Sequence, residues 1–136
     1  MELKLSHVAI AVPEINTIAE RLKALALEVA ETHRVETEKV VAAMIPVEVS
    51  SEFRIELLEP SASGSPIAKF LEKRPAGGMH HLSFEVSNLQ EWKKVLEKNG
   101  FEILPPGIRK AARGIALFIH PRSIGGVLVE LEEIQV

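Results

Sequence analysis

The segment HVAIAV at positions 7–12 decides the fold, because it returns as HLSFEV at positions 81–86. The match extends without a gap from residues 5–59 to residues 79–133. Nine of the 55 aligned columns are identical, and apolar columns also agree at the spacing of three and four that is typical of a helix. These helical columns are Ile15/Leu89, Ile18/Trp92 and Leu22/Leu96. Because a duplicated unit fixes the topology, the sequence predicts two tandem copies of one module.

Each copy is predicted to contain a strand, an amphipathic helix and three further strands. In the first copy we expect strands at 7–12, 28–35, 40–47 and 53–59 and a helix at about 14–26, and in the second copy strands at 81–86, 101–105, 114–120 and 127–133 and a helix at 88–99. The fold class is therefore α+β, with two tandem βαβββ modules in a single domain over 1–136. In the linker 60–78, Ser65 and Pro66 predict the start of a short helix.

The composition excludes several classes of protein. The chain has 136 residues, of which 46% are hydrophobic and 26% charged, so it is long and apolar enough for one core and is not disordered. A net charge of −3 lacks the basic excess of a nucleic-acid-binding protein. The longest apolar run, Val40–Ile45, is far below the roughly 18 residues of a membrane span, and we expect no signal peptide and a soluble, cytoplasmic protein. Without cysteine, any metal would need His, Asp, Glu or carbonyl ligands.

The two faces of the first strand in each copy differ. Alternate side chains share a face, and the apolar face of each first strand should meet the helix of its own copy. The opposite face holds small or polar side chains, namely His7, Ala9 and Ala11 in the first copy and His81, Ser83 and Glu85 in the second. Such a face is the natural wall of a concave cleft.

Two histidines and two glutamates occupy matching columns of the repeat on these polar faces. His7 precedes Glu56 by 49 positions, and His81 precedes Glu130 by the same 49. If the first and last strands of each copy are neighbours and the copies face each other, two nitrogen and two oxygen donors converge. Such a set leaves open positions on a divalent ion such as Mn, Co, Ni, Fe or Zn, as a catalytic metal needs. The alternative to a metal site is that each copy has a surface or hydrogen-bonded histidine and a solvated glutamate.

The remaining histidines and a basic cluster have ordinary explanations. Strand parity groups His80 with Leu82 and Phe84, so we interpret His80 as structural. Solvation or local hydrogen bonding explains His33 and His120. The cluster of Arg109, Lys110 and Arg113 indicates either phosphate binding or a solvated loop.

Several segments resemble the vicinal-oxygen-chelate superfamily, the glyoxalase/bleomycin resistance-like fold whose paired βαβββ modules chelate a divalent metal. Within it, the chain most resembles the methylmalonyl-CoA epimerase family. The segments are HVAIAV (7–12), IELLEP (55–60), SPIAKFLEK (65–73), GGMHHLSFEV (77–86), FIHP (118–121) and GGVLVELEE (125–133). The run from SPIAKFLEK into GGMHH is the most particular to the epimerases. The resemblance implies one divalent ion, with Co, Mn, Zn or Ni as candidates, held by His7, Glu56, His81 and Glu130.

The resemblance also implies an isomerase that interconverts the epimers of an acyl-CoA thioester, methylmalonyl-CoA. Such an enzyme abstracts the α-proton, passes through a metal-stabilised enolate and returns a proton on the opposite face. Glu130 would be both a ligand and one catalytic base. The second acid or base is unassigned, with Glu48, Glu85 and Glu132 as conceivable carboxylates.

Two departures from the epimerase pattern bear on these expectations. The Gly-rich stretch that many epimerases have before FIHP reads IRKAARGI at 108–115 here, which leaves the preferred acyl-CoA open. Some epimerases also carry a proton-transferring glutamate on the middle strand of the first copy. That column falls on Ala42 or Ile45, depending on where a gap is placed, and neither side chain can move a proton.

Three rival functions share this fold. A glyoxalase I-like isomerase would use the same metal on a glutathione adduct, and a metal-free protein that binds a small molecule would need no complete ligand set. A ring-cleaving dioxygenase would need iron with two histidines and one carboxylate. Four intact ligand positions speak against the binding protein and the dioxygenase. The sequence leaves the oligomeric state open, with a homodimer as one option.

Overall fold

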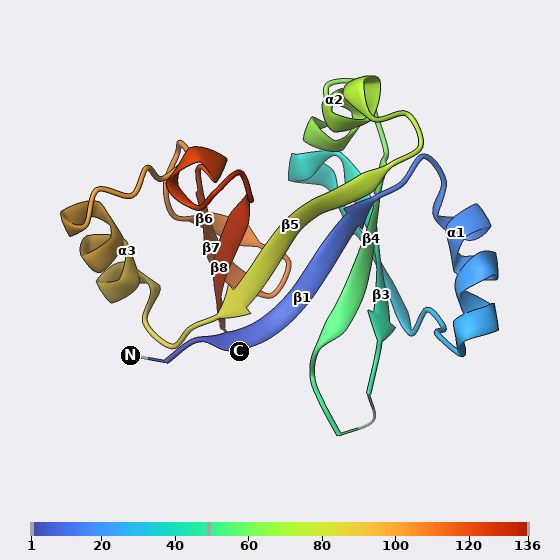
Figure 1. Cartoon of the computed structure of the whole chain (residues 1–136), viewed down its shortest axis with the longest axis horizontal. Helices are drawn as coiled ribbons and strands as arrows, with labels where there is room; N and C mark the ends of the chain where they lie inside the picture. Colours follow the sequence, from blue (N-terminus) through green and yellow to red (C-terminus); the bar gives the residue numbers. More distant parts are fainter. Residues whose placement is uncertain (1, 49, 136) are drawn as a thin grey trace. The chain divides into compact units, whose positions relative to one another are not determined.

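The structure, a computed structural model, describes residues 2–48 and 50–135 as two compact units. The first unit runs from His7 to His80, and the second joins the described residues before His7 to those from His81 onward. Each unit contains one βαβββ set in the expected order, which confirms the predicted α+β fold class. Figure 1 shows the elements in sequence colours.

The first unit is built on a four-stranded sheet with the order β2-β3-β4-β1. β1 and β4 are parallel, and the other neighbours are antiparallel. Its elements are β1 (Lys4–Ala11, which enters this unit at His7), α1 (Ile15–Leu22), β2 (Glu31–Val35), β3 (Val40–Pro46), β4 (Arg54–Pro60) and α2 (Pro66–Lys73), with short 3-10 helices at Lys23–Leu25 and Glu36–Glu38.

The second unit repeats this plan in the order β6-β7-β8-β5, with β5 and β8 parallel and the other neighbours antiparallel. Its elements are β5 (Gly78–Glu85), α3 (Leu89–Lys98), β6 (Arg109–Ala111), β7 (Gly114–Ile119) and β8 (Val129–Ile134), with a short 3-10 helix at Pro121–Ser123. In Figure 1, α3 lies beside the β7 and β8 strands that it covers.

Helices cover the apolar strand faces as the parity argument predicts. In the first unit, the α1 side of the sheet buries Val12, Ile15, Ala43, Ile45 and Leu57. In the second unit, the α3 side buries Val86, Leu89, Leu96, Leu117, Ile119, Val129 and Leu131. These aliphatic clusters leave the opposite faces of β4 and β8 to carry their glutamates.

The opposite face of the first sheet is less open than the sequence predicts, because the linker helix α2 packs on it. Ile67 of α2 belongs to a second buried cluster with Ala9, Ala11, Val40, Ala42 and Leu58. The small alanines of β1 leave room for a helix. α2 begins as expected, with Pro66 in its first turn and the Ser65 hydroxyl accepting a hydrogen bond from the Ile67 amide at 3.1 Å.

The strand expected at 101–105 is wrong. Among the described residues this stretch makes an isolated bridge between Ile103 and Ile119, and the edge strand β6 forms later, at Arg109–Ala111. Pro105 and Pro106 have no amide hydrogen to donate to a strand ladder, so regular pairing starts only beyond them. The basic stretch that follows is thereby placed on the edge of the sheet.

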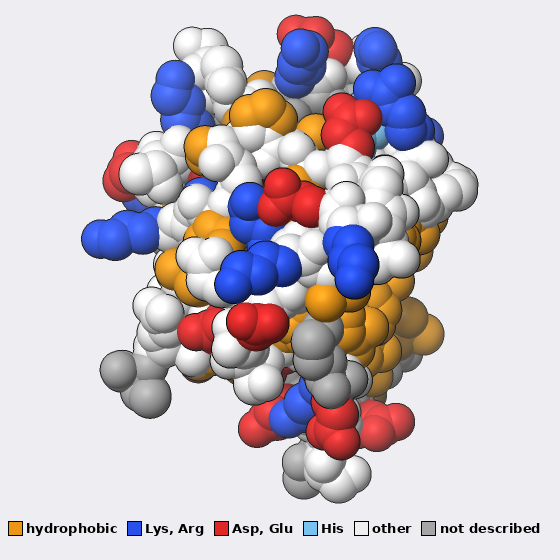
Figure 2. Space-filling view, turned by 90° about the vertical axis from the view of Figure 1, so that its left-hand side faces the viewer, with side chains coloured by type: hydrophobic (Ala, Val, Ile, Leu, Met, Phe, Trp, Pro, Cys, Tyr) orange, Lys and Arg blue, Asp and Glu red, His pale blue; other side chains and the backbone are white. Residues whose placement is uncertain are grey.

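Basic and acidic side chains are interspersed on the surface that Figure 2 shows. On α3, Lys93 pairs with Glu97 at 2.6 Å and Lys94 with Glu91 at 3.7 Å. Exposed pairs of this kind contribute little to stability and mainly solvate the helix. Within residues 2–48 and 50–135, no helix is both long enough and apolar enough to cross a membrane.

Candidate metal centre

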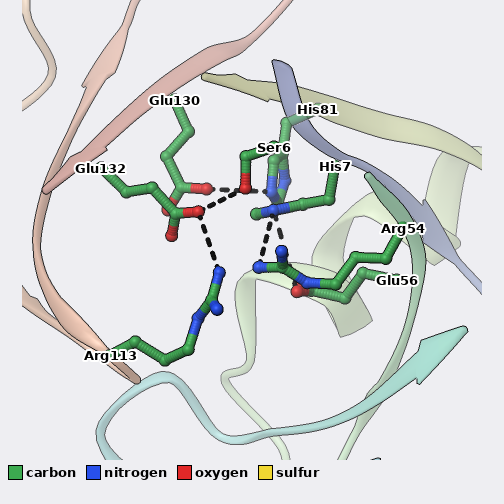
Figure 3. Close-up of polar contacts among 8 residues, drawn as sticks. All are labelled: Ser6, His7, Arg54, Glu56, His81, Arg113, Glu130 and Glu132. Atoms are coloured by element: carbon green, nitrogen blue, oxygen red, sulfur yellow. Dashed lines mark hydrogen bonds and ion pairs between the residues drawn. The ribbon is translucent and has the colours of Figure 1, made fainter. Parts of the chain in front are cut away.

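The pairing of β1 with β4 places His7 beside Glu56 in the first unit. Ala9 lies opposite Glu56, and His7 shares the face of Ala9 because it is two residues away. His7 Nε2 is consequently 3.7 Å from Glu56 Oε2, and the two residues are only 3% and 8% exposed. Figure 3 shows this pair with Arg54 next to it.

Arg54 fixes the tautomer of His7. Its Nη2 lies 3.3 Å from His7 Nδ1. A guanidinium can only donate, so this contact needs the lone pair of Nδ1 and leaves the ring proton of a neutral imidazole on Nε2. The nitrogen that faces Glu56 therefore carries the proton in this arrangement.

The second unit builds the same pair in the same register. Ser83 of β5 lies opposite Glu130 of β8, and His81 is two residues before Ser83. His81 Nε2 is 3.5 Å from Glu130 Oε1, with both residues again buried, at 5% and 8% exposure. Both units thus offer one imidazole nitrogen and one carboxylate from neighbouring parallel strands (Figure 3).

Phe118 of β7 supports His81 of β5 from across β8, the strand that lies between them. It lies opposite Glu130 in the β7–β8 ladder, and its ring meets the His81 ring edge-on at a centroid distance of 5.6 Å. The guanidinium of Arg109 lies over Phe118, 5.1 Å from the ring centroid. This stack limits the rotation of the His81 imidazole.

Glu132 is a second buried carboxylate on the face of β8 that carries Glu130. Its Oε1 accepts a hydrogen bond from the Ser6 hydroxyl and lies 3.4 Å from Arg113 Nη2. The sequence named Glu132 only as a conceivable acid or base. Strand parity already placed it on this face, whereas nothing in the sequence indicates its contacts with Ser6 and Arg113.

The other histidines make local contacts. His80 meets Phe70 edge-on at 5.2 Å, and His33 Nε2 is 2.8 Å from Glu31 Oε2. His120 accepts a hydrogen bond from the Arg122 amide at 3.0 Å and caps a short 3-10 helix. These contacts are of the ordinary structural kind.

Ala42 and Ile45, the two alternative columns for the further proton-transferring glutamate, face opposite sides of β3. Ala42 lies opposite Leu58, on the face that also carries Glu56, whereas Ile45 is fully buried in the core beneath α1. Only position 42 could therefore present a side chain to the face of Glu56. An alanine there supplies no acid or base.

Comparison with known proteins assigns the chain to a superfamily. Residues 6–118 match the model of the glyoxalase/bleomycin resistance protein/dioxygenase superfamily. The ethylmalonyl-CoA/methylmalonyl-CoA epimerase of Cereibacter sphaeroides is 40% identical over 96% of this chain and 98% of its own length.

Two solved structures agree with this relationship. Methylmalonyl-CoA epimerase from Mycobacterium tuberculosis is 30% identical, with a TM-score of 0.88 over 98% of this chain and 89% of that chain. A variant of the Streptomyces coelicolor methylmalonyl-CoA epimerase in complex with 2-nitronate-propionyl-CoA is 27% identical, with a TM-score of 0.89 over 99% of this chain and 100% of that one. The chain belongs to the methylmalonyl-CoA epimerase family of this superfamily.

The donor chemistry of the two pairs fits a divalent metal. Imidazole nitrogen and carboxylate oxygen suit Mn, Co, Ni, Fe and Zn, and the chain has no thiolate to favour a softer ion. In each unit the two donors already lie within 3.7 Å of each other. Each pair therefore has the form of half a metal site.

Proposed function

We propose that the protein inverts the α-carbon of methylmalonyl-CoA or a close acyl-CoA thioester, with one divalent ion held by His7, Glu56, His81 and Glu130. The observation that carries the proposal is the buried His–Glu pair that recurs in both units at matching register. Family membership supplies the reaction, since relatives of this chain are named as epimerases of methylmalonyl-CoA or ethylmalonyl-CoA.

The chemical problem is a weakly acidic proton next to a thioester carbonyl. A divalent ion at such a site stabilises the negative charge that develops on the thioester oxygen as the proton leaves. Four protein donors leave a five- or six-coordinate ion room for substrate. Burial of the donors limits competing water, which strengthens this electrostatic effect.

Glu130 is the proposed catalytic base. A carboxylate that binds metal through one oxygen can accept the α-proton on the other, provided that the substrate lies beside it. Glu130 is held between Ser83 and Phe118 in the sheet, so its position is well defined. No partner base is assigned on the first unit, where Ala42 occupies the relevant face.

The proposal treats the two units as one functional domain, as the repeat predicts, because each contributes half of the ligand set. Whether the protein forms the expected homodimer is a separate question that sedimentation velocity answers.

Inversion itself tests the proposal. Protein loaded with Co or Mn is incubated with one epimer of methylmalonyl-CoA, and the ratio of the two epimers is measured on the intact CoA thioester, because free methylmalonic acid is achiral. We expect epimerisation that stops on chelation and is lost in Glu130→Gln without loss of folding. Absence of inversion by metal-loaded protein contradicts the proposal, and turnover of a glutathione hemithioacetal in its place favours the glyoxalase-like reaction.

A further inference from the structure

Arg113 lies in the turn directly before β7, in the stretch IRKAARGI where the chain departs from the epimerase pattern. Its carbonyl accepts a hydrogen bond from the Gln135 amide at 2.9 Å, which ties its backbone to the end of β8. The next residue, Gly114, lies so close to β8 that a Cβ there would be 2.1 Å from the Glu133 carbonyl oxygen. Position 113 is therefore fixed against the strand that carries Glu130.

The side chain of Arg113 is anchored at one end and accessible at the other. Its Nη2 is 3.4 Å from Glu132 Oε1, yet the side chain is 40% exposed. A guanidinium has five N–H donors, and this contact uses one of them. Because Glu132 is buried, Arg113 neutralises a carboxylate that would otherwise lack this partner, and the same contact orients the guanidinium.

The distance from Glu132 to the proposed catalytic base suits a small dicarboxylic acyl group. Residues two apart on one strand face are separated by about 6.6–6.8 Å. In a malonyl thioester, one carbon separates the thioester carbonyl from the free carboxylate. Figure 3 shows Arg113 at Glu132, next to Glu130. A substrate whose α-carbon lies beside Glu130 would therefore bring its carboxylate within reach of this guanidinium.

Arg109, the other arginine of this stretch, is already engaged. Its guanidinium lies over the Phe118 ring, and its Nη2 donates to the Pro105 carbonyl at 3.0 Å. Lys110 is exposed on the edge strand β6. Arg113 is thus the basic residue of the stretch that is both oriented and accessible.

We propose that Arg113 binds the free carboxylate of the acyl group and makes the protein selective for thioesters of 2-carboxy acids. This inference rests on the proposed function, since it takes the acyl group to lie beside Glu130. An arginine fork binds a carboxylate through two parallel N–H···O bonds, which gives both affinity and orientation. Glu132 acts here through Arg113, by holding its guanidinium in place.

The test compares acyl-CoA affinities of the metal-loaded protein by calorimetry. Malonyl-CoA carries the free carboxylate and has no stereocentre at its α-carbon, so proton exchange leaves it chemically unchanged, whereas propionyl-CoA lacks the carboxylate. We expect Arg113→Gln to reduce the preference for malonyl-CoA over propionyl-CoA roughly tenfold or more, the usual size of a charge-assisted hydrogen bond. The matched control Lys110→Gln should keep the wild-type preference.

Two outcomes overturn the inference. An unchanged preference in Arg113→Gln removes the carboxylate contact, and an equal loss for malonyl-CoA, propionyl-CoA and free CoA assigns Arg113 to the CoA phosphates. If Arg113→Gln does not fold, Arg113→Lys carries the test, because it keeps the charge but loses the fork and should still lower the preference severalfold. The affinity measurements do not depend on turnover. If the protein prefers malonyl-CoA but does not epimerise methylmalonyl-CoA, the proposed reaction is contradicted while the carboxylate subsite is supported.

Discussion

His81 is the residue whose replacement tests the proposed metal centre most directly. His81→Ala removes one nitrogen donor from a buried pair with Glu130. Loss of a group behind a ligand typically costs 10–100-fold in metal affinity, so loss of the ligand itself should cost at least about 100-fold. Calorimetric titration with Co or Mn measures the change.

A matched control separates this effect from general loss of histidine. His33→Ala removes an imidazole that also lies beside a glutamate, but in an exposed pair on β2. Its metal affinity should equal that of the unmodified protein. Unchanged affinity in His81→Ala would instead direct attention to His80, the adjacent imidazole.

Replacement of Arg54 should change the metal affinity in the opposite direction, by raising it. It donates to His7 Nδ1, and binding of a metal through His7 Nε2 requires the ring proton to occupy Nδ1 instead. Arg54→Met removes this competing donor and a nearby positive charge, so it should tighten metal binding severalfold. Titration against Arg34→Met, which removes an exposed arginine, measures the effect, and weaker binding in Arg54→Met would show that Arg54 supports the ligand.

At the scale of elements, the N-terminal cap of α2 stabilises this linker helix, which packs on the first sheet. Ser65 is 1% exposed and caps the helix through the Ile67 amide. Ser65→Ala should lower the free energy of unfolding by about 1–2 kcal/mol. Asn88→Ala removes the exposed cap of α3, whose hydrogen bond to the Glu91 amide is 3.3 Å, and should cost less. Denaturant unfolding compares the two, and a smaller effect at Ser65 would contradict the stabilising role of α2.

The repeat and strand parity placed His7 and Glu56, and likewise His81 and Glu130, in matching columns, but a contact within each pair required the first and last strands to be neighbours, as β1 and β4 and β5 and β8 are. A strand alternates every two residues, and the same offset applies in both units, so the parity of His7 and Glu56 was readable from the sequence alone. The position of β6 could not be read from the sequence in this way. The two prolines before β6 interrupt a pattern that otherwise looks like a strand. The contact of Arg113 with Glu132 could not be predicted from the sequence for another reason. The partner of a long side chain depends on the three-dimensional positions of both segments, which no short sequence period gives.

At the scale of the whole molecule, the proposed site joins residues from both units through one ion. An ion that binds only the folded chain adds about 2.7 kcal/mol of stability at a free concentration 100 times its dissociation constant. Saturating Co or Mn should therefore raise the free energy of unfolding by about that amount, and chelation should remove the gain. His81→Ala should show little metal-dependent stabilisation, whereas equal stabilisation of both proteins would place the ion elsewhere.

The ratio of proton exchange to inversion depends on the number of catalytic bases. Ala42 supplies no proton donor on the face of Glu56, so Glu130 is the single base that the proposal assigns. In deuterated water, metal-loaded protein should then exchange the α-proton of methylmalonyl-CoA faster than it inverts the carbon, because a proton removed by one base returns most readily to the same face. Solvent deuterium followed by NMR, with chiral analysis of the same samples, gives both rates. Equal rates of exchange and inversion would require a second acid or base, and the carboxylates of Glu48, Glu85 and Glu132 would be the first to replace by glutamine.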